Sequence, residues 1–213
     1  MTQHDVVSTR PLARSLRLVR ANLGAYLVLN ALMYGAVLAG MVAGLLFPEL
    51  TAARASGLDD DGTTDLVVSL MSNVPLFALT IFAVNVFTVA IAAILLPSLV
   101  VPFAGVAIGV YHAATFGVTL APVDDTIAVL LIPHSLTILI EVQAYVLVML
   151  GAYLLGRAWL RPASVGADTR RQGYLAGLRQ VGLLSLPALA LFVVGAVYEA
   201  LSLRYILPLL VGV

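Results

Sequence analysis

The chain has 213 residues, of which 62% are hydrophobic and 10% are charged, with a mean hydropathy of +1.07 and a formal net charge of zero. Soluble globular domains have roughly half apolar and about a quarter charged residues, so this composition excludes an ordinary water-soluble fold. The chain has no cysteine, which excludes disulfides, thiolate metal sites and a cysteine nucleophile. No basic patch with interleaved aromatic residues is present, so no nucleic-acid partner is predicted.

The apolar residues come in runs long enough for helices to cross a bilayer, whose hydrocarbon core is about 30 Å thick. The sequence therefore predicts an all-α, polytopic transmembrane helical bundle with about five spanning helices. The expected spans, with boundaries good to a few residues, are 22–47, 76–96, 99–120, 134–158 and 181–207.

The first segment, residues 1–21, is basic and lacks a short apolar core ending in an Ala-x-Ala cleavage site, so it is predicted to be retained. Its arginines are Arg10, Arg14, Arg17 and Arg20. At helical spacing this segment can lie on the inner leaflet, where anionic lipids attract arginine. A solvated lead-in helix is the open alternative.

The connections between the spans differ in charge. Residues 48–75 are rich in aspartate and are predicted to form an external loop, and Pro97 with Pro102 marks a tight reversal. Residues 159–180 are predicted to form a cytoplasmic loop with a short interfacial helix, and residues 208–213 an apolar C-terminal tail. Small-residue pairs such as Gly40-x-x-x-Gly44 and Gly105-x-x-x-Gly109 permit close helix approach.

Pro133 interrupts the long apolar stretch before the fourth span. Proline lacks the amide donor and clashes with the preceding turn, so residues 127–132 are predicted to form a short separate segment. Whether that segment spans the bilayer, re-enters it or lies at its interface is left open.

The arginines predict the orientation. With five crossings and the N-terminus inside, nine of the eleven arginines fall on the inner side, as the positive-inside rule requires. The expected location is the cytoplasmic membrane, with the C-terminus outside. All eleven basic residues are arginine, a bias that favours a GC-rich bacterial genome.

Ionisable side chains within spans are expensive and mark a polar interior or a site. The catalytic candidates are His112, His134, Glu141 and Glu199, with Asn85, Thr137, Tyr145 and Tyr198 as supporting polar residues. Asn85, His112 and Glu199 are predicted to lie about 12–14 Å below the outer surface, near one level. Arg157 stands at a helix end, from which its side chain can reach the membrane surface.

Positions 134, 137, 141 and 145 follow the spacing of a single helix face. His134 and Glu141 are predicted to lie about 10 Å apart along the axis, so a water, a substrate, a metal or Glu199 would have to bridge them. A divalent metal held by His134, Glu141 and Glu199 is left open, and no other cofactor is identified. The alternative for each residue is a protonated or hydrogen-bonded contact between helices.

Pro133-His134, followed by Glu141, Gly151 and Gly156-Arg157, resembles the proline–histidine–glycine, glutamate and glycine–arginine signature of the stage II sporulation protein M family. Here Glu141 stands three residues farther from the histidine than in that family, and Ser135 replaces the usual glycine. Asn85 and Val197-Tyr198-Glu199-Ala200 also resemble the family's second and last spans. The resemblance implies a membrane protein that works with partner proteins, since the founding member acts in a complex that drives septal peptidoglycan degradation.

Two functional interpretations follow. The first is a non-enzymatic scaffold or permease-like subunit that contacts the lipid bilayer and other membrane proteins or a second copy of itself. The second is a membrane-embedded enzyme with an outward-facing pocket, for example a cofactor-independent isomerase or epimerase acting on a peptide or lipid through paired acid and base groups. An ion-coupled transporter is a variant of the second interpretation.

Overall fold

The computed structural model describes residues 11–211, apart from the side chains of Thr126 and Val211, and the described residues form helices and their connections, with no strand. Arg10 lies outside the described residues. The elements in chain order are α1 (Pro11–Ala21), α2 (Leu23–Leu46), α3 (Pro48–Asp60), α4 (Thr63–Leu70), α5 (Val74–Ala83), the π-helix η1 (Val84–Leu95), α6 (Leu96–Val100), α7 (Ala104–Thr119), α8 (Asp125–Leu160), the 3₁₀ helix η2 (Pro162–Val165), α9 (Arg170–Leu201), the π-helix η3 (Ser202–Ile206) and α10 (Leu207–Val211). The predicted all-α bundle is confirmed.

Four of the described helical stretches are long and apolar enough to cross a membrane, namely Leu23–Leu46, Val74–Val100, Ile127–Leu160 and Arg170–Leu210. The predicted third span corresponds to α7, a shorter apolar helix of 16 residues. A span needs about 20 residues, so α7 reaches this length only with its flanking turns. The prediction of five crossings therefore stays a prediction.

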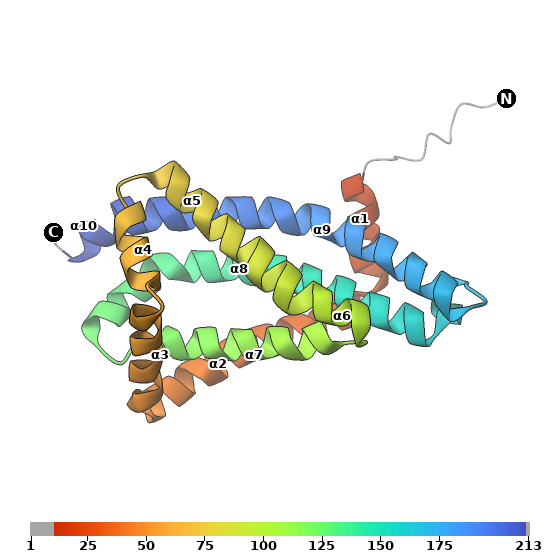
Figure 1. Ribbon diagram of the computed structural model, residues 1–213, viewed down its shortest axis with the longest axis horizontal. Coiled ribbons are helices and arrows are strands. Elements are labelled where there is room, and N and C mark those ends of the chain that lie inside the picture. The colour runs from red at the N-terminus through yellow and green to blue at the C-terminus, as the bar shows by residue number, and fades with distance from the viewer. Residues whose placement is uncertain (1–10, 212–213) are drawn as a thin grey trace.

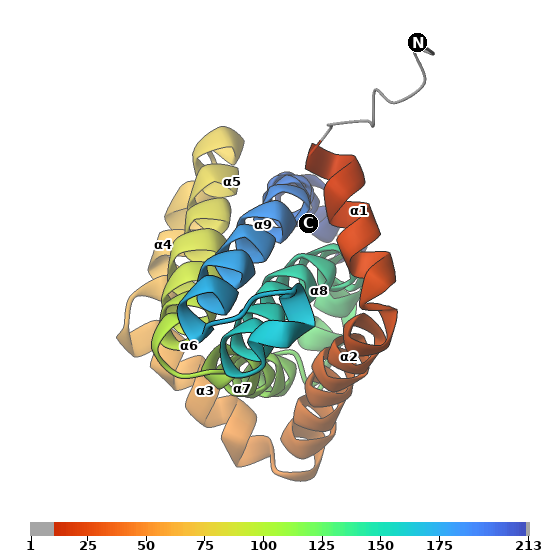
Figure 2. The ribbon, with the colours of Figure 1, turned by 90° about the vertical axis from the view of Figure 1, so that its right-hand side faces the viewer.

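Helix α8 forms the centre of the bundle. Figure 1 shows it between α9 on one side and α2 and α7 on the other, and Figure 2 shows the same helices from the end. Its side chains are buried nearly all round in the second half, where Met149, Leu150 and Leu154 are completely inaccessible. A helix that is apolar on every side is one that other helices surround.

The outer faces of the surrounding helices are apolar and exposed. Leu38, Phe87 and Leu139 are each more than half exposed, on α2, η1 and α8. Apolar surface of this extent is unfavourable in water but suits contact with acyl chains. Together with the four long apolar helices, it identifies a multi-pass membrane protein.

Helices α2 and α7 approach so closely that their backbones nearly touch. A Cβ atom on Gly40 would lie 2.0 Å from the Ala114 carbonyl oxygen, and a Cβ on Gly117 would lie 2.1 Å from the Val37 carbonyl oxygen. Only glycine fits at such a crossing. The Gly40-x-x-x-Gly44 pair identified in the sequence therefore faces α7.

Two prolines lie inside long helices. Pro187 in α9 cannot donate to the carbonyl of Leu183, one turn earlier, and the buried Ser15 hydroxyl of α1 donates to that oxygen at 2.6 Å. The predicted separate segment before Pro133 is wrong, because α8 runs unbroken from Asp125 to Leu160. Pro133 leaves the carbonyl of Val129, one turn earlier, without its amide donor, and transmembrane helices tolerate such a proline where local adjustment or neighbouring helices offset the loss. The Tyr198 hydroxyl of α9 donates to the carbonyl of Pro133 itself at 3.2 Å and so joins α8 to α9 beside the proline.

The connections also differ from the sequence prediction. The segment predicted as an external loop carries α3 and α4, which lie across one end of the bundle (Figure 1). At their junction the Thr63 hydroxyl and amide donate to Asp61, and these hydrogen bonds hold the pKa of Asp61 below its ordinary value. The predicted interfacial helix is not separate, because Arg170 to Gln180 form the first turns of α9, after a Thr169 capping box.

Charge is distributed unevenly between the two ends of the bundle. The acidic residues of α3 and α4 lie at one end, and α1 and the connection between α8 and α9 lie at the other (Figure 1). The arginines at this second end include Arg20, Arg157, Arg161, Arg170 and Arg171. We call it the arginine-rich end.

Candidate functional site: a polar seam between α8 and α9

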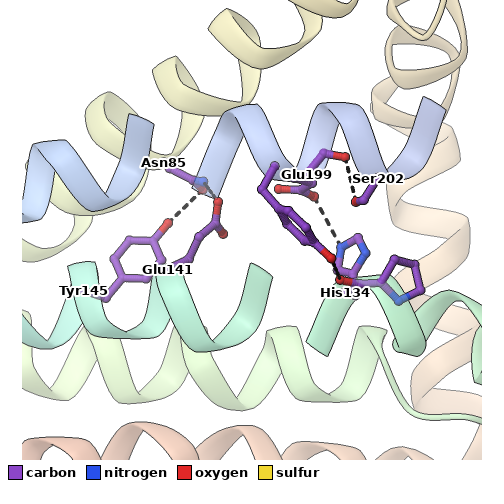
Figure 3. Close-up of polar contacts among 8 residues, drawn as sticks. Asn85, His134, Glu141, Tyr145, Glu199 and Ser202 are labelled. Atoms are coloured by element: carbon purple, nitrogen blue, oxygen red, sulfur yellow. Dashed lines mark hydrogen bonds and ion pairs between the residues drawn. The ribbon is translucent and has the colours of Figure 1, made fainter. Parts of the chain in front are cut away.

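The polar side chains predicted to share one face of α8 meet α9 and η1 in the interior (Figure 3). We call this group the polar seam and define it as Asn85, His134, Thr137, Glu141, Tyr145 and Glu199. Of these, His134, Thr137 and Glu141 are buried and the other three are half-buried. Their placement follows from the helical repeat of α8, because residues three and four apart lie on the same side.

The first contact in the seam joins His134 of α8 to Glu199 of α9. The His134 Nε2 atom lies 3.3 Å from the Glu199 Oε1 atom, and the two side chains are 9% and 17% exposed. The contact is an ion pair when the imidazole is protonated and a hydrogen bond when it is neutral. Next to this contact, the Ser202 hydroxyl donates to the backbone carbonyl of Glu199 at 3.0 Å.

The second contact is a hydrogen-bonded chain of three residues from η1 and α8. The Asn85 amide donates to the Glu141 carboxylate at 2.7 Å, and the Tyr145 hydroxyl donates to the Asn85 side-chain oxygen at 2.8 Å (Figure 3). The Tyr145 ring packs edge-on against Phe192 of α9, with 4.9 Å between ring centroids. The Glu141 carboxylate is thus hydrogen-bonded to η1, and its side chain packs against α9.

Gly195 of α9 makes room for the Glu141 side chain. A Cβ atom at position 195 would lie 2.8 Å from Glu141 Cγ and 3.2 Å from its Oε1 atom. Gly195 and Glu199 are four residues apart, so the same face of α9 touches both contacts. The two glutamates therefore line one seam rather than opposite sides of the bundle.

Two polar atoms in the seam have no hydrogen-bond partner among the residues that the structure describes. They are the Nδ1 atom of His134 and the hydroxyl of Thr137, both buried. Thr137 stands one turn after His134 and one turn before Glu141, so it lies between the two contacts along α8. A buried polar atom without a partner costs free energy. A water or a small polar ligand would therefore be stabilised beside the His134 Nδ1 atom or the Thr137 hydroxyl.

The seam is bounded by irregular helix. Asn85 is the second residue of the π-helix η1, and Ser202, the first residue of the π-helix η3, follows Glu199 by three positions. A π-turn inserts an extra residue and rotates the side chains that follow, and such turns are frequent at functional sites. No signal in the sequence predicted them.

His112 does not join the seam. It lies half-buried on α7, and among the described residues no hydrogen bond or ion pair links it to His134, Glu141 or Glu199. Within residues 11–211 no group of three or more His, Asp or Glu side chains is arranged to hold a metal ion. A metal bridging His134, Glu141 and Glu199 stays a prediction, as do the catalytic roles of the four candidates.

The sequence analysis missed a second polar network, on the opposite face of α8. The Gln143 amide donates to Asn30 at 2.7 Å and to the Tyr34 hydroxyl at 3.0 Å, and the Tyr26 hydroxyl donates to the Gln143 oxygen. The available signal was the four-residue spacing of Tyr26, Asn30 and Tyr34, which puts them on one face of α2. This network joins α8 to α2, while the polar seam joins α8 to α9 and η1.

Chemically, the polar seam combines two carboxylates, an imidazole and a phenol away from bulk solvent. Such groups can hold helices together or exchange protons. No family model, curated protein or solved structure matches this chain. The resemblance to the stage II sporulation protein M family therefore stays a prediction.

Proposed function

We propose that this protein is a non-enzymatic subunit of a membrane complex, in which the polar seam holds the bundle together and the apolar outer faces contact lipid and partner membrane proteins. The observation that supports this proposal is the pairing of both seam carboxylates. Glu199 pairs with His134, and Glu141 accepts a hydrogen bond from Asn85. In this proposal the arginine-rich end faces the cytoplasm, as the positive-inside rule favours.

The pairing favours an assembly role because it joins three separate elements. An unpaired carboxylate in hydrocarbon is costly, so only an arrangement that brings α8, α9 and η1 together satisfies both glutamates. Polar contacts of this kind select one packing among many that apolar side chains would allow. The resemblance to a family whose founding member works within a membrane complex points in the same direction.

The test compares Glu141→Gln with Glu141→Ala in native membranes. The glutamine side chain keeps an oxygen that accepts from Asn85, whereas alanine leaves Asn85 and Tyr145 with a gap. We expect the glutamine variant to keep the native electrophoretic size of the wild-type complex in mild detergent. The alanine variant should lose about 1–3 kcal/mol of stability and with it the complex.

A wild-type protein that migrates only as a monomer would contradict the proposed assembly role. A Glu141→Gln variant that folds with wild-type stability but dissociates from the complex would also contradict it. In that case the charge of the carboxylate, and not only its hydrogen bond to Asn85, would be needed for assembly.

A second function, proton exchange at the seam, is favoured by one specific observation. The Thr137 hydroxyl, which has no hydrogen-bond partner among the described residues, lies along α8 between Glu141 and the His134–Glu199 contact, and a water or substrate there would complete a path from one carboxylate to the other. This function would make the protein an acid–base enzyme or an ion-coupled transporter. In proteoliposomes holding a pH-sensitive dye, it predicts proton flux in the wild type that Glu141→Gln abolishes at unchanged stability.

A further inference from the structure

An apolar groove runs along α2 on the outside of the bundle, separate from the polar seam. It has a volume of about 500 Å³, and its walls include Val28 and Leu32 of α2, Phe103 and Val106 from the start of α7, and Tyr153 of α8. Val28 and Leu32 are 58% and 43% exposed. Its α2 wall extends from Gly24 to Leu32, about 12 Å at the helical rise, so the groove is elongated along that helix.

A cation stands at the arginine-rich end of this groove. The Arg157 guanidinium lies 5.8 Å from the centroid of the Tyr153 ring and donates from Nη2 to the Asn22 side-chain oxygen at 2.9 Å. Its Nε atom is buried and has no partner, and no carboxylate within the described part of the chain lies within ion-pair distance of Arg157. Arg157 is half-buried, and within the described part of the chain some of its hydrogen-bonding capacity is unmet. That its side chain reaches the membrane surface stays a prediction.

The groove wall beside Arg157 is strained. Phe103 has a φ of 67°, the one positive φ among the non-glycine residues that the structure describes. A bulky residue in this region is energetically unfavourable and persists only where its surroundings hold it. The Phe103 ring packs against Tyr153, with 5.7 Å between centroids, and covers Gly156, where a Cβ would lie 2.8 Å from it. Strain of this kind clusters at ligand clamps.

We propose that this groove binds one anionic phospholipid, with an acyl chain along α2 and the phosphate on Arg157. The groove is apolar over its length and cationic at one end, which matches an amphiphile with a hydrocarbon chain and an anionic head. A bilayer supplies that molecule directly, and basic sites between transmembrane helices bind anionic headgroups. Arginine suits a phosphate because its planar group donates two parallel hydrogen bonds.

The test uses the full chain in nanodiscs of phosphatidylcholine with a minority of phosphatidylglycerol, followed by native mass spectrometry. We expect one phosphatidylglycerol to remain bound to the wild type after excess lipid is stripped. Arg157→Gln should weaken its retention at least tenfold, because a charged hydrogen-bonding partner of the phosphate is lost. Arg161→Gln is the matched control, since Arg161 lies at the same end, one turn later, and is exposed. It should stay within twofold of wild type.

A groove variant makes the test independent of Arg157. Val28→Trp fills the groove from its exposed side and leaves Arg157 unchanged, so it should lower retention of phosphatidylglycerol. This variant keeps the proposal testable if Arg157→Gln fails to fold. Equal losses in the Arg157 and Arg161 variants would overturn the proposal in favour of diffuse attraction. Undiminished retention of phosphatidylglycerol by Val28→Trp would also overturn it. The same holds if the wild type retains no lipid, or if a peptide segment occupies the groove instead.

Discussion

Replacing Gly40 with alanine is expected to lower the free energy of unfolding by about 2–3 kcal/mol. The new Cβ atom would lie 2.0 Å from the Ala114 carbonyl oxygen, so α2 and α7 would have to separate. Backbone atoms cannot move aside as a flexible side chain can, so the packing of the two helices is lost over several residues. The change is measured by reversible unfolding of the purified protein in mixed micelles.

Gly35→Ala is the matched control for this prediction. Gly35 lies on the same helix, and a Cβ there would meet no atom within 4 Å. Alanine is the better helix former by about 1 kcal/mol, so this variant should be as stable as wild type or more stable. Equal destabilisation of the two variants would show that α2 does not cross α7 at Gly40.

Replacing His134 with leucine is expected to cost about 3 kcal/mol. The change removes the partner of Glu199 and leaves that carboxylate in a largely buried position. Replacing Glu199 alone should cost a similar amount, whereas the double leucine variant should recover most of the loss, because two apolar side chains leave no unpaired charge. A double-mutant cycle of unfolding free energies measures this coupling.

His112→Leu serves as the comparison, because His112 lies outside the polar seam. Its effect should stay below about 1 kcal/mol and add to that of Glu199→Leu. Costs at His134 and Glu199 that simply sum would contradict a direct contact between them.

Much of the fold could be predicted because lipid restricts the choice of structure. Backbone groups in hydrocarbon must satisfy one another, so long apolar runs form helices. The shared face of His134, Thr137 and Glu141 likewise followed from the helical repeat alone. The break at Pro133 was mispredicted because the local rule for proline takes no account of packing by neighbouring helices, and α8 continues across the one missing hydrogen bond.

The pairing within the polar seam could not be predicted, because it depends on the register between helices. The sequence left Glu199 open as one of several bridges between His134 and Glu141, whereas the structure pairs Glu199 with His134 and Glu141 with Asn85. The π-helices that begin at Val84 and at Ser202 have no sequence signature. Gln143 was overlooked because its partners lie on α2, more than a hundred residues away in the chain.

The account depends on α8 and α9 packing in the register that brings His134 to Glu199. At the other end of the same interface, a Cβ on Gly151 would lie 3.8 Å from the Cβ of Val181, the spacing of a disulfide. Because the chain has no cysteine of its own, Gly151→Cys/Val181→Cys can be oxidised in native membranes and scored by thiol labelling.

We expect that pair to form a disulfide nearly completely under a mild oxidant. The control, Gly151→Cys/Gly182→Cys, should keep its thiols free, because a Cβ at Gly182 points into open space. Equal oxidation of both pairs, or oxidation of the control alone, would mean that α9 lies in another register and that the polar seam does not exist as described.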